Sequence, residues 1–167
     1  YFSHSEMVNF MESISRYKEL CEIVLPKYEE YVVDEDCRQL MHSIQDIEIK
    51  RREHNERFVE SELEYHSAYF DTVLGKYPLD QQQRESIVKL EDNCLVVASA
   101  GSGKTSTIVG KVKYLVEKRG VDPTKILLLT YTRKAANELA ERIKVEGMTS
   151  GTFHGLAYKI IAEVTGL

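Results

Sequence analysis

The chain has 167 residues, of which 43% are hydrophobic and 29% charged, a balance typical of folded globular domains rather than of disordered segments. No apolar run reaches the ~20 residues that a membrane-spanning helix needs, and the opening lacks the basic segment and apolar core of a secretory signal. Three cysteines without a paired CxxC spacing argue against a disulfide framework or a structural zinc site. We therefore expect a cytoplasmic protein with no membrane partner.

Charge and glycine content divide the chain into two regions. Residues 1–78 carry nine Lys and Arg against 17 Asp and Glu, whereas residues 79–167 carry 13 against 10. Regions of opposite charge balance usually face different partners. No glycine occurs before Gly75, so the first region lacks the usual turn signals. We expect an N-terminal helical region over residues 1–78 and a second domain over 79–167.

Apolar residues recur every three or four positions through the first region, which is the period of a helix. A first helix is expected to end at Pro26, and its apolar face comprises Met7, Phe10, Ile14, Tyr17, Cys21 and Val24. A second helical run begins near Asp34, a suitable N-cap, and reaches Val73. Two such helices predict an antiparallel hairpin, with the acidic residues 34–36 at its tip.

From Leu79 onward the pattern changes to strand, glycine-containing loop and helix, repeated. The expected strands are 94–97, 126–130 and 148–152, and the expected helices are 104–118, 133–144 and a last one through Ile161. Strands that alternate with helices predict a parallel sheet, with the first strand buried. The fold class is therefore α/β: the first part of a P-loop parallel sheet, preceded by an all-α helical hairpin.

Residues 98–105, ASAGSGKT, fit the pattern of a phosphate-binding loop. Gly101 and Gly103 let the backbone approach phosphate oxygens, which the loop N–H groups and the start of the next helix then hold. Lys104 is expected to contact the β- and γ-phosphates, and Thr105 to ligate Mg²⁺. The remaining nucleotide-binding candidates complete the loop and the helix start: Ala98, Ser99, Ala100, Ser102 and Ser106.

A polar segment, PLDQQQRE at 78–85, precedes the first expected strand. The Gln83 side chain could pair with the edge of adenine through two hydrogen bonds, and Arg84 beside it joins the candidate nucleotide site. A polar residue on a short surface helix is the alternative for Gln83.

Four motifs follow one another in the chain: Leu79-x-x-x-Gln83-Arg84, the loop at 98–105, ILLLTYTRKAA at 126–136, and GTFHGLA at 151–157. This order resembles the UvrD/Rep superfamily 1 DNA helicases, and among them the helicase IV-like members, over residues 79–161. A weaker likeness extends upstream through HNERF at 54–58 and YFD at 69–71. The resemblance implies a RecA-like motor domain, ATP and Mg²⁺ as cofactors, and 3′ to 5′ movement on single-stranded DNA.

The same resemblance implies contacts with single-stranded DNA for Thr130, Tyr131, Thr132, Thr152, Phe153 and His154. An aromatic face stacks on any base, and hydroxyl groups hold phosphates without reading sequence. Without the resemblance, Tyr131 and Phe153 fit equally well as packed residues and His154 as a helix cap. Lys134 and Arg142 could contact phosphates or form a solvated helix face.

Some features depart from the family pattern. Ser106 stands where many members carry arginine, which predicts the loss of a charge-assisted contact to the nucleotide. No aliphatic strand ending in Asp-Glu follows the loop, and VVDED at 32–36 precedes it. DIEIK at 46–50 has the spacing of a nuclease core but lies in a helical pattern, which predicts a solvated face. We expect the chain alone to bind adenine nucleotide weakly and to hydrolyse it negligibly, with ATP hydrolase and helicase activity residing in a longer protein.

The acidic first region has two interpretations. It could cover the motor as a structural appendage. It could instead insert into a protein machine, as in helicase-like ATPases that remodel or recycle RNA polymerase, or dock on other DNA-processing proteins. DNA itself is a poor partner for it, because DNA phosphates repel acidic side chains.

Overall fold

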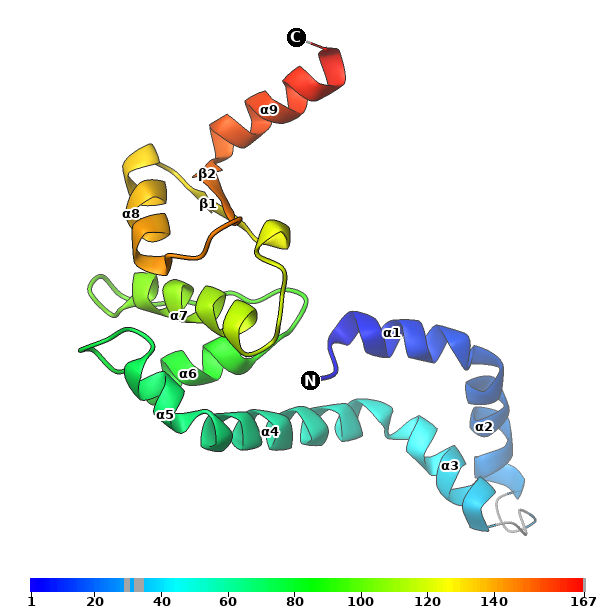
Figure 1. Ribbon diagram of the computed structural model, residues 1–167. Coiled ribbons are helices and arrows are strands. Elements are labelled where there is room, and N and C mark those ends of the chain that lie inside the picture. The colour runs from blue at the N-terminus through cyan, green and yellow to red at the C-terminus, as the bar shows by residue number, and fades with distance from the viewer. Residues whose placement is uncertain (29–30, 32–34, 167) are drawn as a thin grey trace. The chain divides into compact units, whose positions relative to one another are not determined.

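Figure 1 shows the computed structural model of the chain, which describes residues 1–28, 31 and 35–166. They form two compact units: unit 1 comprises Tyr1–Tyr65 and Lys89–Leu95, and unit 2 comprises His66–Val88 and Val96–Leu167. Residues 66–78, which the glycine pattern groups with the first region, thus cluster with unit 2. None of the helices in the described ranges is long and apolar enough to cross a bilayer.

Unit 1 is built from helices: α1 (His4–Ser13), α2 (Ser15–Tyr28), α3 (Glu35–Gln45) and α4 (Ile47–Tyr65). Both of the long helices expected from the sequence are divided, the first at Ile14 and the second at Asp46 and again at His66. Pro26 does not end its helix but lies in the last turn of α2. α2 packs along α3, as the predicted hairpin requires (Figure 1). The expected N-cap Asp34 lies outside the described residues.

The break at Ile14 changes which apolar side chains are buried in unit 1. Met11, Ile14 and Met41 pack on the buried Ile44. Phe10 and Tyr17, which the periodicity places on the packed face, are 43% and 62% exposed. A helical period does not continue across a break, because the next helix starts with its own phase. The sequence pattern is therefore right about helix formation and wrong about these two side chains.

The start of the chain is held to α4 and to residues 89–95 by hydrogen bonds within unit 1. The Phe2 N–H donates to Asn55 Oδ1 and the Phe2 carbonyl accepts from Asn55 Nδ2, both at 2.8 Å. Glu91 accepts from the Tyr1 hydroxyl at 2.9 Å, the His4 N–H at 2.6 Å and Arg51 Nη1 at 3.2 Å. We call this set the N-terminal clamp: Tyr1, Phe2, His4, Arg51, Asn55 and Glu91.

The clamp shifts the ionisation of its members. Burial and the bond to Glu91 raise the pKa of the Tyr1 hydroxyl to about 12. Burial acts to raise the pKa of Glu91 as well, but the hydrogen bonds from His4, Tyr1 and Arg51 outweigh it, so that pKa is lowered. Beside the clamp, the Ser5 hydroxyl and N–H each donate to Asp92 at 2.7 Å, which lowers the pKa of Asp92. These contacts favour ionised carboxylates and a neutral tyrosine.

The segment DIEIK at 46–50 begins at the turn residue before α4 and continues through the first turn of that helix. Glu48 pairs with Arg51 at 3.1 Å and with Arg52 at 3.3 Å. The hydrogen bond from Arg51 is the main reason that the pKa of Glu48 is lowered. These pairs join residues three and four positions apart along α4, and the Arg51 side chain is only 11% exposed.

Unit 2 combines helices with a two-stranded parallel sheet. Its elements are α5 (Ser67–Thr72), α6 (Gln81–Val88), α7 (Lys104–Glu117), the short 3₁₀ helix η2 (Pro123–Lys125), β1 (Leu127–Thr130), α8 (Arg133–Ile143), β2 (Thr149–Thr152) and α9 (Phe153–Thr165). Leu127 lies opposite Thr149, and Thr130 opposite Thr152. Parallel strands need a crossover connection, which α8 provides (Figure 1). The predicted α/β alternation is confirmed for these elements.

The apolar core of unit 2 forms around α7. Val109 and Val112 of α7 pack with Leu139 and Ile143 of α8, and side chains such as Leu128 of β1 pack against this cluster. Amphipathic helices bury their apolar stripes in this way.

A second contact brings α6 close to α7. A Cβ on Gly110 would lie 2.7 Å from Ile87 Cδ1 and 3.2 Å from Leu79 Cδ1, so glycine permits this approach. Nearby, Phe70 and Tyr114 are fully buried, with ring centroids 5.9 Å apart. The core therefore fixes the helix that begins directly after the glycine loop.

Residues 94–97 do not form the buried strand that the sequence predicts. They belong to no strand, and Leu95 and Val97 are 87% and 86% exposed. An apolar run predicts strand conformation but does not supply the neighbour whose backbone completes the hydrogen bonds. In the described part of the chain, β1 and β2 pair with each other and with no third strand. The last helix also differs from the expectation, because α9 continues to Thr165.

Candidate functional site

The glycine loop at 98–103 leads directly into α7. Gly101 and Gly103 both have φ of +81°, a conformation that side chains other than hydrogen disfavour. Gly103 is also the N-cap of α7, and in the described structure no side chain caps this helix. By contrast, Ser3, Thr132 and Thr152 accept hydrogen bonds as the N-caps of α1, α8 and α9. The start of α7 thus keeps N–H groups that no side-chain cap occupies, which is the arrangement that an anion needs.

Lys104 folds back over the loop. Its Nζ donates to the Ala98 carbonyl at 2.9 Å and to the Ser99 carbonyl at 2.6 Å. The Ser102 hydroxyl donates to the same Ser99 carbonyl at 2.7 Å. The predicted loop residues are therefore brought together, with an ammonium group at the centre of their polar contacts. Ala100 lies in the exposed part of the loop.

Gln83 contacts the loop from α6. Its Nε2 donates to the Ser102 carbonyl at 3.2 Å, and a Cβ on Gly103 would collide with the same amide. Its Oε1 accepts from the Asp80 N–H at 3.0 Å while Asp80 Oδ1 accepts from the Gln83 N–H at 2.9 Å, a reciprocal capping box. The residue proposed to read adenine thus bonds the glycine loop and takes part in the cap of α6.

Arg84 makes structural contacts. Its Nε donates to the Leu79 carbonyl at 2.7 Å, and its Nη2 bonds Asp71 at 2.6 Å. These bonds tie α6 to α5. Among the described residues, the Arg84 side chain forms no hydrogen bond or ion pair with the glycine loop.

Ser106 and Thr105 occupy the first turn of α7. Thr105 is half-buried. The Ser106 hydroxyl accepts a hydrogen bond from Arg142 Nη2 of α8 at 3.3 Å. A guanidinium group is therefore present beside the position where many members of the resembled family carry arginine, although it comes from a different helix. Nothing in the local sequence around Ser106 indicates this contact.

The second set of candidate residues lies at the carboxyl edge of the parallel strands. Tyr131 follows β1 and is 91% exposed, and Phe153 follows β2 and is 51% exposed. Their ring centroids lie 5.7 Å apart. His154 is also exposed. Packing of the two aromatic side chains in a core, the alternative for both, is not what the structure shows.

Threonine hydroxyl groups at this edge organise the backbone. Thr132 Oγ1 accepts from the Ala135 N–H at 3.2 Å and Thr152 Oγ1 accepts from the Gly155 N–H at 3.1 Å, so these residues start α8 and α9. Thr130 Oγ1 donates to the Thr132 carbonyl at 2.8 Å. The six predicted residues are brought to one edge because β1 and β2 are parallel and in register.

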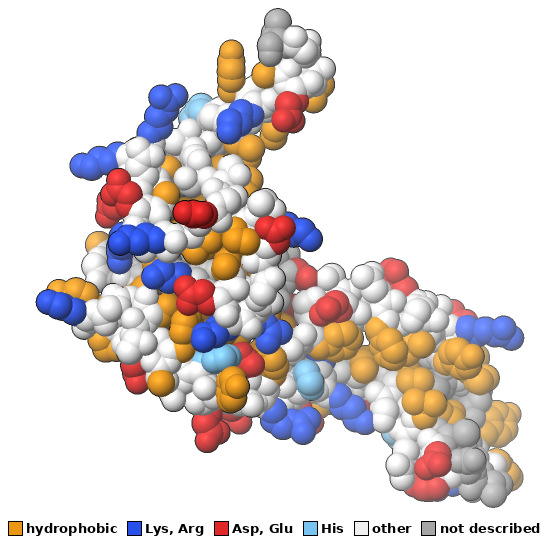
Figure 2. Space-filling model, viewed as in Figure 1, with side chains coloured by type: hydrophobic (Ala, Val, Ile, Leu, Met, Phe, Trp, Pro, Cys, Tyr) orange, Lys and Arg blue, Asp and Glu red, His pale blue; other side chains and the backbone are white. Residues whose placement is uncertain are grey.

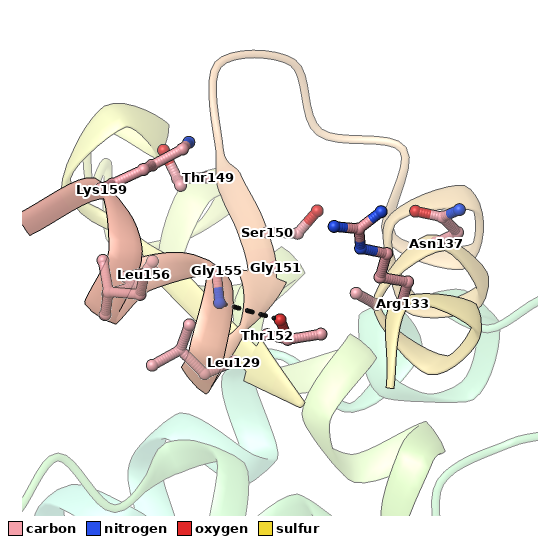
Figure 3. Close-up of a pocket in the computed structure, with 12 residues that line it drawn as sticks. Leu129, Arg133, Asn137, Thr149, Ser150, Gly151, Thr152, Gly155, Leu156 and Lys159 are labelled. Carbon is pink, nitrogen blue, oxygen red and sulfur yellow. Dashed lines mark hydrogen bonds between the residues drawn. The ribbon is translucent and has the colours of Figure 1, made fainter. Parts of the chain in front are cut away.

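A pocket of about 270 Å³ lies beside this edge, between the strands and α8 and α9. Figure 3 shows Arg133 extending toward Ser150, and Lys159 extending toward Thr149. Leu129 and Leu156 form part of its apolar lining (Figure 3). The sequence did not predict these pocket residues. A Lys or Arg on a helix gives the same sequence pattern whether it faces solvent or a neighbouring strand.

Metal ligation by side-chain clusters has little support in the described residues, where no group of three or more His, Cys, Asp and Glu side chains is placed to hold a metal ion. The loop motif makes Thr105 the candidate ligand for Mg²⁺, and its hydroxyl suits that ion only together with phosphate oxygens and water. The acidic segment VVDED lies partly outside the described residues, and its Glu35 and Asp36 begin α3.

Comparison with known proteins gives a consistent result. Residues 79–165 match the UvrD/REP helicase N-terminal domain. The chain is 38% identical to DNA helicase IV of Escherichia coli strain K12 over 137 residues, which is 77% of this chain and 20% of that protein. It is 39% identical to DNA helicase II of the same organism over 89 residues, or 50% of this chain and 12% of that protein. It is 38% identical to the ATP-dependent DNA helicase UvrD1 of Mycobacterium tuberculosis strain H37Rv over 95 residues, or 53% and 12%.

The aligned part of the chain thus covers 12–20% of the length of these relatives. The family match includes the glycine loop, Gln83, and the aromatic edge formed by Tyr131 and Phe153. More than half of the chain lies within the matched range. All three relatives are named as DNA helicases. The chain therefore belongs to the UvrD/REP helicase family.

Proposed function

We propose that this chain is the N-terminal part of an ATP-dependent superfamily 1 DNA helicase with a RecA-like motor, acting in the cytoplasm. In this proposal the loop at 98–105 binds ATP with Mg²⁺, and the Tyr131–Phe153 edge contacts single-stranded DNA during 3′ to 5′ movement. The direction of movement rests on the family resemblance alone. The observation that carries the proposal is the helix α7, which starts at a left-handed glycine with no side-chain cap and has Lys104 in its first turn.

The residues present fit a nucleotide phosphate. Anion binding at a helix start needs N–H groups that no cap occupies, and a backbone without a Cβ in the way; α7 and its two glycines meet both conditions. Lys104 would exchange its contacts with the Ala98 and Ser99 carbonyls for phosphate oxygens, and Thr105 would supply a hydroxyl ligand to Mg²⁺. When bound, ATP would supply the phosphoryl group and Mg²⁺ would neutralise charge on the phosphate oxygens.

Two further side chains support the site. The Gln83 amide donates to the Ser102 carbonyl of the loop. In this proposal the same side chain supports the loop and contacts adenine. Arg142, held by Ser106, offers a guanidinium in place of the charge-assisted contact that Ser106 itself cannot make.

The aromatic edge suits single-stranded nucleic acid. Exposed aromatic rings bind bases by stacking without regard to sequence, and the exposed Tyr131 lies next to Phe153. Hydroxyl groups hold phosphates without reading sequence. Thr132 and Thr152 accept backbone hydrogen bonds through Oγ1, which leaves their hydroxyl protons to donate, and Thr130 lies beside them. His154 completes the edge.

A second candidate is a helicase-like ATPase that remodels protein complexes, including RNA polymerase, through its acidic helices. The observation that favours it is the start of α3, where Glu35 and Asp36 are both exposed. Such a surface repels DNA and suits a basic protein surface.

The decisive experiment measures ATP hydrolysis by the intact protein against increasing single-stranded DNA. Lys104→Ala should lower the rate of ATP hydrolysis by about 100-fold or more, because it removes the positive charge that stabilises the phosphate oxygens. Lys125→Ala is the matched control, since Lys125 is an exposed lysine in η2. A rate that survives in the Lys104 variant would refute the nucleotide site.

The DNA arm uses the aromatic edge. Tyr131→Ala should weaken DNA stimulation by about tenfold or more, given the usual contribution of one stacked base. Tyr65→Ala, a tyrosine that is 82% exposed in unit 1, should leave stimulation unchanged. A rate that depends on Lys104 but is indifferent to DNA would favour the second candidate.

A further inference from the structure

Unit 1 contains a groove of about 670 Å³ between α1, α2 and the ends of α3 and α4. Its apolar floor includes Met7, Met11, Ile44 and Ile47. Ile44 is buried and Met11 packs on it, whereas Met7 lies outside that packed cluster. Figure 2 shows hydrophobic side chains gathered between α1 and α3 on this side of the unit. The groove is large enough for several apolar side chains of a ligand.

Carboxylates surround the groove. Four glutamates line it, against one lysine: Glu12, Glu19, Glu22, Glu48 and Lys18. Lys18 pairs with Glu22 at 3.8 Å, and Glu48 pairs with Arg51 and Arg52. Within the described part of the chain, Glu12 and Glu19 form no ion pair. Two carboxylates beside the apolar floor are thus not neutralised by an ion pair within the described residues.

Methionine-containing apolar grooves accept the apolar faces of amphipathic helices, because the methionine side chain adapts to different shapes. Acidic rims add selectivity for basic partners. The glutamates repel nucleic acid, because its phosphates are also negative. A second copy of this acidic unit is repelled for the same reason. We propose that this groove binds an amphipathic helix of a protein partner, with Lys or Arg side chains beside its apolar face that contact Glu12 and Glu19.

This interaction is independent of nucleotide hydrolysis, so it can be tested separately. The probe is a helical peptide of about 14 residues, with leucine on one face and lysine on the flanks, labelled with a fluorophore. Its binding to the intact protein is measured by fluorescence anisotropy at physiological salt. A peptide with glutamate in place of every lysine is the comparison probe.

The expected result is binding of the lysine peptide and none of the glutamate peptide. The double variant Glu12→Lys/Glu19→Lys should weaken binding by about tenfold or more, because two attractive charges become repulsive. Glu60→Lys/Glu64→Lys is the matched control, since both residues are exposed glutamates of α4 outside the groove. The control pair should bind as the unchanged protein does.

A third variant tests the apolar floor without disturbing the packed cluster. Met7→Gln keeps the length of the side chain and should weaken peptide binding by about threefold or more, because it removes apolar contact. Circular dichroism confirms that each variant keeps its helices. Equal weakening in the two charge-reversed pairs, unchanged binding in the Met7 variant, no binding at all, or displacement of the peptide by single-stranded DNA would each overturn the proposal.

Discussion

Different interactions stabilise the two units of the chain. The 19-residue helix α4 of unit 1 buries only Asn55 and Val59, whereas the 14-residue helix α7 of unit 2 buries Thr107, Val109, Gly110, Val112 and Tyr114. In the described residues, unit 1 combines a small apolar cluster around Ile44 with the bonds of the N-terminal clamp, whereas the core of unit 2 is built from several buried apolar side chains. The glycine loop therefore leads into a helix that an apolar core holds in place. The helices of unit 1 instead keep exposed faces that partners can contact.

The largest expected effect tests this difference with two phenylalanines. Phe70→Ala in unit 2 should lower the free energy of unfolding by about 4 kcal/mol, because it leaves a cavity at a fully buried ring. Phe10→Ala in unit 1 should cost about 1 kcal/mol or less, since that ring is 43% exposed. Urea unfolding of the two variants measures both values. Similar losses would show that the two units do not differ in this way.

The second prediction concerns the loop. Gly103→Ala should lower the free energy of unfolding by about 2 kcal/mol, because it strains a left-handed backbone and collides with the Gln83 amide. Gly120→Ala is the control: its φ is +66° but nothing lies near its Cβ position, so it should cost about 1 kcal/mol. Adding Gln83→Ala should recover part of the loss at Gly103 and none at Gly120. A Gly103 variant no less stable than the Gly120 variant would contradict the contact.

The third prediction concerns the N-terminal clamp. Asn55→Ala removes both hydrogen bonds to the Phe2 backbone and should cost about 1–2 kcal/mol, because Asn55 is buried. The loss should be local, so amide hydrogen exchange should accelerate about tenfold at the start of the chain and remain unchanged in unit 2. Asn9→Ala, at an exposed position of α1, is the control. Acceleration throughout both units would mean that the clamp supports the whole fold.

The smallest effect is the pH dependence of the same clamp. The folded pKa of Glu91 is lowered, so its contribution to stability is full above the ordinary carboxyl pKa and is lost as the pH falls through the folded value. The folded pKa of Tyr1 is raised to about 12, so its contribution is full below the ordinary tyrosine pKa and is lost as the pH rises through about 12. Urea midpoints across these ranges should change less in Glu91→Gln on the acid side and in Tyr1→Phe on the alkaline side. Unchanged acid dependence in Glu91→Gln would remove that carboxylate from the clamp.

Local patterns predicted much of unit 2. The helix after the loop, α8 and the two parallel strands follow from periodicity, which acts within a few residues. The caps at Thr132 and Thr152 appear only in the structure. The exposed pairing of Tyr131 with Phe153 required only that the two strands be parallel and in register. The buried strand at 94–97 failed because strand pairing depends on a distant neighbour.

Other features could not be read from the chain. Arg142 is 36 positions from Ser106, and Glu91 is 90 positions from Tyr1; no local pattern links residues so far apart. The role of Gln83 as a brace for Ser102 and Gly103 likewise depends on how α6 packs against α7.

The sequence by itself determined the family, the phosphate-loop motif and most helix positions, because these depend on residue types at short spacings. Tertiary structure alone decided which apolar faces are buried, that the start of α7 has no side-chain cap while those of α8 and α9 do, and that Glu12 and Glu19 stand beside an apolar groove. The physical reason is that burial and ion pairing depend on distances in space, and helices that break, as at Ile14, change those distances without changing the local pattern.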